Sequence, residues 1–427
     1  MPTLAPQEQV NTIRFSDVFQ AHSTIDIERV YRQWKYSERI WNDGEYIKSV
    51  GIKKDILEYL YSIQVNNEFK HVPPFMSVGW GVAIGHIGSL GAFVLGQKLN
   101  LFPSNLRYLP VRDQHSSFLV KNFLQDSIGL ASSRFGFAIL ENPSSWHLSE
   151  RLQMVGTTKD FISLYEMHEL VYKNLQTVRG KVRLSINPDY ETWAEAALRK
   201  LGLPRDAWFV GLHVREKPAN PLDPRTAKLE TFYQSISEIE KRGGWIIRFG
   251  TGVMTPLPSK RNILDLNIEN EDLKRLHLYV IAKSLFLLST NSGPNTVAWA
   301  LGTPVLQTNT LSIARNILSS SDGSLFLPKK YRFGKGQLCS FSQIIGSKAW
   351  YWEKNLREIS ALGFEIIDNS EEEILEATKD MFHFVEKGNH NALLKSRVNE
   401  IRKSCNAVGY GQISPSFLHR NENWFLS

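Results

Sequence analysis

The feature that most restricts the fold is the stretch from Ser284 to Ala314, which contains no Lys, Arg, Asp or Glu. A transmembrane helix needs about 20 mostly apolar residues, but the centre of this stretch reads Asn-Ser-Gly-Pro-Asn. In lipid, a helix broken there leaves backbone groups without hydrogen bonds. Residues 71–97 are also uncharged and are interrupted by prolines and glycines. Both stretches therefore favour a buried strand, a loop and a helix over a membrane span.

Short apolar runs alternate with amphipathic segments from residue 74 onwards, which is typical of an α/β sheet with parallel strands. In the N-terminal half we expect strands at 75–84, 106–111 and 135–140 and helices at 89–99 and 116–128. In the C-terminal half we expect strands at 209–214, 245–249, 263–266, 285–290 and 305–308. Helices are predicted at 229–239, 276–282 and 296–301, and a last one after the capping-box sequence Ser-Glu-Glu-Glu at 370–373.

This pattern divides the chain into four parts. We expect a helical N-terminal extension at 1–72, a Rossmann-like domain at 73–207, a second Rossmann-like domain at 208–370, and C-terminal helices at 371–427 that pack back on the first domain. The formal net charge of +7 favours anionic partners, but no run of five basic residues occurs, so nucleic acid is not indicated. Two cysteines fit a reducing compartment, and the N-terminus lacks the order of a secretory signal. We expect a cytoplasmic protein, with contact to the inner face of a membrane left open.

The strongest local signal is the segment 290–295, Thr-Asn-Ser-Gly-Pro-Asn, between a buried strand and a helix. Ser292 can cap the helix, Gly293 can adopt unusual backbone angles, and Pro294 suits the first helical turn. A helix N-terminus at the carboxyl end of a parallel strand favours an anion, typically a phosphate. Asn291 and Asn295 flank the turn and are included in the expected site. The alternative is a well-capped helix without a ligand.

Arginines follow two neighbouring strands of the same series. Strand alternation places His213 and Arg215 on one side of their strand, and Arg248 with Gly250 ends the next strand. A guanidinium matches a phosphate through paired hydrogen bonds. The two arginines and the serine-glycine helix start therefore predict a diphosphate site. The alternative is that the arginines form structural ion pairs with Glu216 or Asp265.

A glycine-rich loop is predicted at 83–91, after the first strand of the N-terminal half. Its Gly85 and His86 face the expected acceptor side, together with Asp113. A histidine there can act as a general base or bind a phosphate, and a hydrogen-bonded loop histidine is the alternative. Asp113 and Glu166 are weaker candidates for the base. The chain has no Asp-x-Asp metal clamp, no G-x-S-x-G motif and no P-loop.

The succession of these motifs resembles a group of bacterial glycosyltransferases distantly akin to protein O-fucosyltransferases and heptosyltransferases. The resemblance is carried by the segments 83–86, 211–216, 243–250, 254–258, 290–294, 301–304, 364–370 and 413–418. It implies a GT-B arrangement, with two Rossmann-like domains facing across a cleft, and an inverting transfer that needs no metal or other cofactor. It also implies that Arg215 contacts the donor diphosphate. The acceptor needs a base on the opposite face of the sugar, supplied by the N-terminal domain, and we choose His86 for this role.

The expected substrates are a nucleotide sugar, with GDP-sugars slightly favoured, and a glycan, lipid-linked or protein acceptor in polysaccharide or glycoconjugate biosynthesis. Glu216 and the segment 249–251 depart from the usual pattern of the group. The second departure leaves the base of the donor nucleotide open. Two other classes remain open: a non-hydrolysing nucleotide-sugar epimerase and a non-catalytic binder of phosphorylated glycans. The oligomeric state is not indicated.

Overall fold

The computed structural model describes residues 84–101, 182–216, 222–250, 254–266, 270–311, 324–334, 356–387 and 412–426, with shorter pieces at 33, 36–37, 39–40, 48–49, 51–52, 55, 75–76, 107–108, 122–123, 129–130, 154–156, 161–163, 167, 170–171, 174–175, 336, 338–340 and 343–344. The chain forms two compact units. Unit 1 is made of residues 1–81, 102–112 and 128–164, and unit 2 of residues 82–101, 113–127 and 165–427.

Unit 1 contains a small parallel sheet. Its strands are β1 (Phe75–Met76), β2 (Arg107–Tyr108) and β3 (Gly129–Leu130), in that order. An antiparallel pair, β4 (Met154–Gly156) and β5 (Phe161–Ser163), belongs to the same unit. Parallel pairing in the N-terminal half is therefore confirmed. The strand expected at 135–140 lies outside the described residues, as does most of the helix expected at 116–128.

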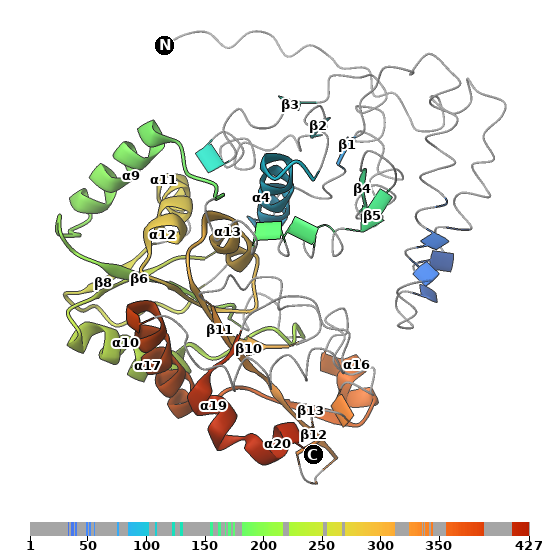
Figure 1. Cartoon of the computed structure of the whole chain (residues 1–427). Coiled ribbons are helices and arrows are strands. Elements are labelled where there is room, and N and C mark those ends of the chain that lie inside the picture. Colours follow the sequence, from blue (N-terminus) through green and yellow to red (C-terminus); the bar gives the residue numbers. More distant parts are fainter. Residues whose placement is uncertain are drawn as a thin grey trace, which may run out of the picture. The chain divides into compact units, whose positions relative to one another are not determined.

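Unit 2 is built on a sheet of seven parallel strands (Figure 1). The strands are β6 (Phe209–His213), β7 (Trp245–Arg248), β8 (Ile263–Asp265), β9 (Leu287–Thr290), β10 (Val305–Thr310), β11 (Leu325–Pro328) and β14 (Gln412–Ile413). Their spatial order is β8-β7-β6-β9-β10-β11-β14. The chain first adds strands on one side of β6 and then returns to add the rest on the other side. This doubly wound topology confirms the α/β prediction, and the order reverses between β6 and β9.

Helices cover both faces of this sheet. One face carries η4 (Leu229–Phe232), α10 (Tyr233–Lys241), α17 (Glu371–Lys387) and α19 (Pro415–Arg420), followed by α20 (Glu422–Leu426). The other face carries α12 (His277–Lys283) and α13 (Pro294–Leu301), flanked by α9 (Pro188–Lys200), α11 (Glu271–Arg275) and α4 (Ile84–Lys98). A hairpin of β12 (Lys330–Phe333) and β13 (Phe364–Ile367) follows β11, with α16 (Leu356–Ala361) before its second strand. In the described part, no helix combines the length and the apolar character needed to cross a bilayer.

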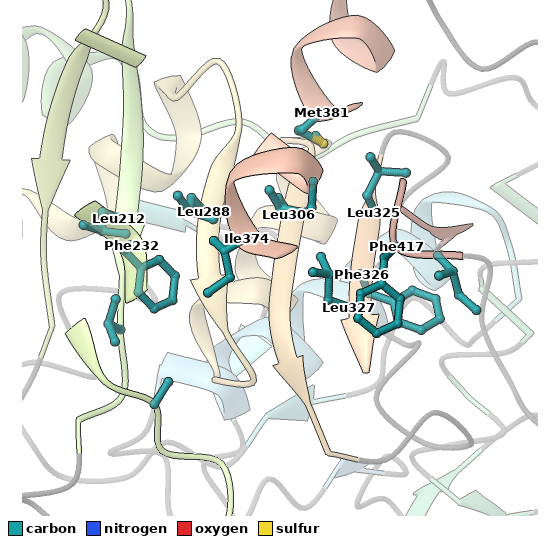
Figure 2. Packing of buried hydrophobic residues seen from close by; sticks show 14 of the residues in the cluster. Leu212, Phe232, Leu288, Leu306, Leu325, Phe326, Leu327, Ile374, Met381 and Phe417 are labelled. Atoms are coloured by element: carbon teal, nitrogen blue, oxygen red, sulfur yellow. The ribbon is translucent and has the colours of Figure 1, made fainter. Parts of the chain in front are cut away.

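The core lies between the sheet and α17 (Figure 2). Ile374 and Met381 of α17 are fully buried over Leu288 and Leu306 of the central strands. Burying a side chain of this size contributes about 1.5–3 kcal/mol. The predicted capping box starts the helix, since the Ser370 N–H donates to the Glu373 carboxylate (2.9 Å) and the Glu373 N–H donates to the Ser370 hydroxyl (3.2 Å).

The C-terminal segment 371–427 differs from expectation, because its described part packs on the C-terminal sheet rather than on the N-terminal domain. β14 is the edge strand of that sheet beside β11, and Phe417 of α19 belongs to the same core as α17. The reason is physical: α17 carries an apolar stripe and β9, β10 and β11 share an apolar face, and leaving either of them in water is unfavourable.

The glycine-rich loop expected at 83–91 is also corrected, because α4 begins at Ile84 and is helical through this segment. Gly85 and His86 therefore lie in the first turn of a helix. Glycine disfavours helices, but Gly91 lies where α4 meets α13. A Cβ atom there would lie 2.8 Å from the Phe123 ring and 2.9 Å from the Ala300 Cβ. The lack of a side chain at Gly91 therefore allows α4 and α13 to pack closely against each other.

Candidate functional site

The candidate site lies where the strand order reverses. β6 and β9 are neighbours, and their last residues, His213 and Thr290, end at the carboxyl edge of the sheet. The Arg215 backbone N–H donates to the Thr290 hydroxyl (2.9 Å), which joins the two departing loops. One loop leads to α10 on one face and the other to α13 on the opposite face. In open α/β sheets, ligands bind in the crevice formed at such a point.

His213 is buried at the centre of this edge. Its Nδ1 lies 3.1 Å from the Phe249 carbonyl oxygen and its Nε2 lies 2.9 Å from the Ser292 hydroxyl. Burial lowers the pKa of His213 to about 4, so the ring is neutral near pH 7. The carbonyl can only accept, so Nδ1 carries the proton, and Nε2 accepts a hydrogen bond from Ser292. His213 therefore orients the Ser292 hydroxyl and carries no charge of its own.

The start of α13 differs in detail from the prediction. Ser292 was expected to cap the helix, but its hydroxyl points to His213 instead. Gly293 occupies the N-cap position with ordinary right-handed angles (φ −56°, ψ −39°), and no side chain caps the helix. Pro294 takes the first helical position as predicted. Pro294 has no N–H, and the N–H groups of Asn295 and Thr296 donate to the Ser292 and Gly293 carbonyls (3.3 and 3.0 Å). The N-terminus therefore offers an anion chiefly the positive end of its dipole.

Asn295 was expected to face the ligand, and the structure corrects this. Its Nδ2 donates to the Thr290 carbonyl (3.0 Å) and to Gln307 (2.8 Å), and its oxygen accepts from Ser289. The side chain is fully buried and ties α13 to β9 and β10. Buried amides need such partners, because an unmet polar group is costly inside a protein. Asn291, on the loop between β9 and α13, is also buried.

Arg215 remains a candidate ligand contact. Its Nη1 donates to Asp223 (3.0 Å), yet about a third of its side chain (33%) is exposed. The same carboxylate is held by Arg225, through Nε (2.9 Å) and Nη2 (2.7 Å). Arg225 was not predicted, because the Asp-Pro-Arg sequence at 223–225 matches no motif and its loop follows β6 by several residues.

Arg248 was expected to bind the donor, and the structure shows the structural alternative. Its side chain is fully buried, with Nη2 on Glu216 and Nη1 3.3 Å from Asp265. Nη1 also contacts the Thr255 carbonyl. Glu216 accepts from the Thr255 N–H (2.9 Å), and Asp265 accepts from the Leu257 N–H (2.9 Å). This cluster fastens residues 254–257 over the ends of β7 and β8, and a buried charge requires such pairing.

Gly250 lies next to the buried histidine. A Cβ atom at Gly250 would lie 2.8 Å from the Met254 sulfur and 3.7 Å from His213 Nδ1. The lack of a side chain thus lets the segment after β7 pack closely against His213. This position supports the shape of the site and offers a ligand nothing beyond its backbone.

The residues expected on the acceptor side are only partly placed. Gly85 and His86 lie in α4, a helix that packs against α13 within unit 2. Asp113 and Glu166 lie outside the described residues. The role of His86 as a base stays a prediction. Within the described part of the chain, no three His, Cys, Asp or Glu side chains gather as metal ligands, and Cys339 is a free, buried thiol.

Neither protein-family models nor curated protein sequences match the chain. Among solved structures, it is similar to a family 9 glycosyl transferase from Veillonella parvula DSM 2008, with 11% identity and a TM-score of 0.38 over 60% of this chain and 86% of that one. It is also similar to the E. coli ADP-heptose LPS heptosyltransferase II, with 14% identity and a TM-score of 0.30 over 59% and 75%.

A third similar structure is the dodecameric iron-containing glycosyltransferase TibC from enterotoxigenic E. coli H10407, with 11% identity and a TM-score of 0.29 over 56% of this chain and 58% of that one. All three are bacterial glycosyltransferases, the group that the motifs of this sequence resemble.

Proposed function

We propose that the chain is a glycosyltransferase that moves a sugar from a nucleoside-diphosphate donor to a glycan, lipid-linked or protein acceptor. The observation that carries the proposal is the edge where β6 and β9 end. There Arg215 and the uncapped N-terminus of α13 are tied to the same pair of strand ends. Both are groups that bind phosphate. The succession of sequence motifs favours sugar transfer over other reactions of diphosphates.

The proposed chemistry follows from charge. Breaking the bond between sugar and phosphate develops negative charge on the leaving diphosphate. A guanidinium and the positive end of a helix dipole that are already in place stabilise this charge more in the transition state than in the bound donor. Arg215 and the start of α13 fill this role in our proposal. They are the reason to propose a reaction that proceeds without a metal ion.

Ser292 has a separate part in the proposal. Its single hydroxyl proton is used in the hydrogen bond to His213 Nε2. The serine oxygen can then only accept a further hydrogen bond. An acceptor suits a hydroxyl of the donor's ribose or sugar better than it suits a phosphate oxygen. In this scheme the diphosphate is bound by Arg215 and by the positive end of the α13 dipole.

The acceptor needs a base that removes its proton as the sugar is transferred. We assign this role to His86 at the start of α4, on the opposite face of the sugar from the diphosphate, which gives inversion at the transferred carbon. The donor is a nucleotide sugar, with a GDP-sugar favoured. The epimerase alternative differs in needing no acceptor at all.

The central test is the substitution Arg215→Ala. Loss of a charge-assisted contact should cost about 2–4 kcal/mol in transition-state stabilisation, which corresponds to a rate loss of roughly 30-fold to 1,000-fold. Arg215→Lys should recover only part of the rate, because an ammonium lacks the fork of a guanidinium. Arg261→Ala is the matched control, since Arg261 is exposed before β8, at the amino edge of the sheet.

Binding is measured first, by thermal shift with GDP, UDP, ADP, TDP and CMP, because a ligand that binds the folded state raises its stability. Transfer is then followed with a radiolabelled sugar donor of the base that binds. Failure of the wild-type protein to bind any of the five nucleotides contradicts the proposal. Wild-type turnover in Arg215→Ala contradicts the diphosphate assignment, and sugar interconversion without acceptor favours the epimerase.

A further inference from the structure

Two arginines share one buried carboxylate beside the candidate site. Asp223 accepts hydrogen bonds from Arg225 at both of its oxygens and from Arg215 at Oδ2 (3.0 Å). The Asp223 side chain is 5% exposed, whereas the Arg215 and Arg225 side chains are 33% and 29% exposed. The carboxylate is therefore hidden beneath two guanidinium groups that reach solvent.

The charges in this group do not cancel. Two guanidinium groups meet one carboxylate, and Glu216, the next acid along the strand end, is taken up by Arg248. Burial would raise the pKa of Asp223, but hydrogen bonds and charge from Arg225 lower it overall, so the carboxylate is ionised. Burial and the charge of Arg225 lower the pKa of Arg215. The two cations thus repel each other, and an anion bound between them relieves that repulsion.

Hydrogen-bond donors are left over. Each guanidinium has five N–H groups, and Arg215 uses only Nη1 on Asp223, while its buried Nε has no hydrogen-bond partner. Arg225 uses Nε and Nη2. Among the described residues, Nη2 of Arg215 and Nη1 of Arg225 have no partner. A buried donor without a partner is unfavourable, and a ligand that draws the side chain towards itself can supply the missing hydrogen bond.

The described segment 222–227, which carries Asp223 and Arg225, is held at several points. The Ala227 N–H donates to the Arg215 carbonyl (2.9 Å), and the Thr226 hydroxyl donates to the Asp223 carbonyl (2.9 Å). The buried Lys329 donates to the Thr226 carbonyl (2.8 Å). A segment fixed in this way loses little conformational entropy when a ligand binds.

We propose that Arg225 is a second arginine of the diphosphate site, and that Asp223 is the positioning residue that holds it beside Arg215. This inference rests on the proposed function. Two adjacent guanidinium groups match two adjacent phosphate groups, each of which can accept paired hydrogen bonds. The pair should therefore make the site prefer nucleoside diphosphates to monophosphates.

The test compares Arg225→Gln, Arg215→Gln, the double variant and the control Arg261→Gln in the full chain. Calorimetry gives the affinities for GDP, UDP, ADP and TDP and for the matching monophosphates. We expect Arg225→Gln to weaken diphosphate binding about tenfold to hundredfold and monophosphate binding much less. The double variant should lose less than the product of the two single losses, because both residues hold the same ligand group.

The Asp223→Asn substitution tests whether Asp223 favours binding by positioning the two arginines or affects it only through its negative charge. The substitution makes the site more positive, so attraction by charge alone predicts tighter diphosphate binding. Loss of the shared carboxylate releases both guanidinium groups, so positioning predicts weaker binding and a smaller preference over monophosphates. Urea unfolding and circular dichroism establish that the variant is folded. Tighter binding overturns the positioning role of Asp223.

The outcomes also separate this inference from the function on which it rests. Wild-type protein that binds no nucleoside diphosphate overturns both. If the wild type binds and Arg215→Gln weakens binding, but Arg225→Gln matches Arg261→Gln for both classes of nucleotide, then the second arginine is overturned and the proposed function stands.

Discussion

The buried cluster around Arg248 offers the sharpest test of the structure. The Arg248→Met substitution keeps a long apolar side chain but removes the cation between Glu216 and Asp265. The Glu216 side chain is only 6% exposed, so in the variant its carboxylate would stay buried without a cation. The Asp265 side chain is 27% exposed, so its carboxylate can be hydrated instead. Breaking a buried pair on one side costs about 3–5 kcal/mol, so we expect the free energy of unfolding to fall by that amount, nearly all of it from Glu216.

Urea unfolding, followed by tryptophan fluorescence, measures this loss. The double variant Arg248→Met/Glu216→Gln removes the orphaned charge as well, and it should recover a large part of the stability, since neutral replacement of a whole buried pair is often tolerated. Nucleotide affinity of folded Arg248→Met should stay within a few fold of wild type. An Arg248→Met protein with wild-type stability and no nucleotide binding would refute the reasoning, because the guanidinium would then be a ligand contact.

Three further predictions concern acid, metal and base. Burial lowers the pKa of His213 from 6.5 to about 4, so the unfolded chain takes up a proton between these values that the folded chain does not. The free energy of unfolding should therefore decrease as pH falls from about 6.5 to 4, by roughly 3 kcal/mol. His213→Asn should lack that slope in urea titrations, and equal slopes contradict the assignment. Transfer should survive EDTA, because Arg215 and the helix N-terminus supply the positive charge; loss on chelation that manganese or magnesium restores contradicts this. His86→Ala should lower kcat by about 10²–10⁴ with little change in nucleotide affinity, and near-normal kcat in His86→Asn removes the histidine from the mechanism.

The sheet of unit 2 could be predicted from the sequence because its strands are buried on both faces. Phe209–His213 and Leu287–Thr290 are continuous buried runs, and such runs appear as apolar or uncharged stretches between turn residues. The capping box at Ser370 depends only on neighbours in the sequence, so it too was predictable. The packing of α17 against the C-terminal sheet was not, because an apolar stripe shows that a helix is buried but not which surface covers it.

The roles of the arginines could not be predicted from local sequence. Arg215 and Arg248 both follow apolar strands, and the pattern gave them the same role. The difference comes from partners far along the chain, since Glu216 lies 32 residues before Arg248. Arg225 was overlooked for the opposite reason: its partner Asp223 is two residues away, but nothing in the sequence brings their loop back to the end of β6. A glycine-rich segment such as 83–91 is similarly ambiguous until Ala300 is known to lie against Gly91.

The carboxyl edge of the sheet illustrates how a balanced set of charges can still attract an anion. Three arginines, at 215, 225 and 248, face three acids, at 216, 223 and 265, so the six groups sum to zero. They are nevertheless unequally divided. Two acids surround Arg248: Glu216 accepts the Thr255 N–H and Asp265 accepts the Leu257 N–H. The surplus cations surround Asp223 and reach solvent. Since a ligand interacts most strongly with the charges it can approach, this edge presents arginine rather than carboxylate beside the positive end of α13. In our proposal, the division of the acids between two clusters, more than the number of arginines, suits this edge to a diphosphate.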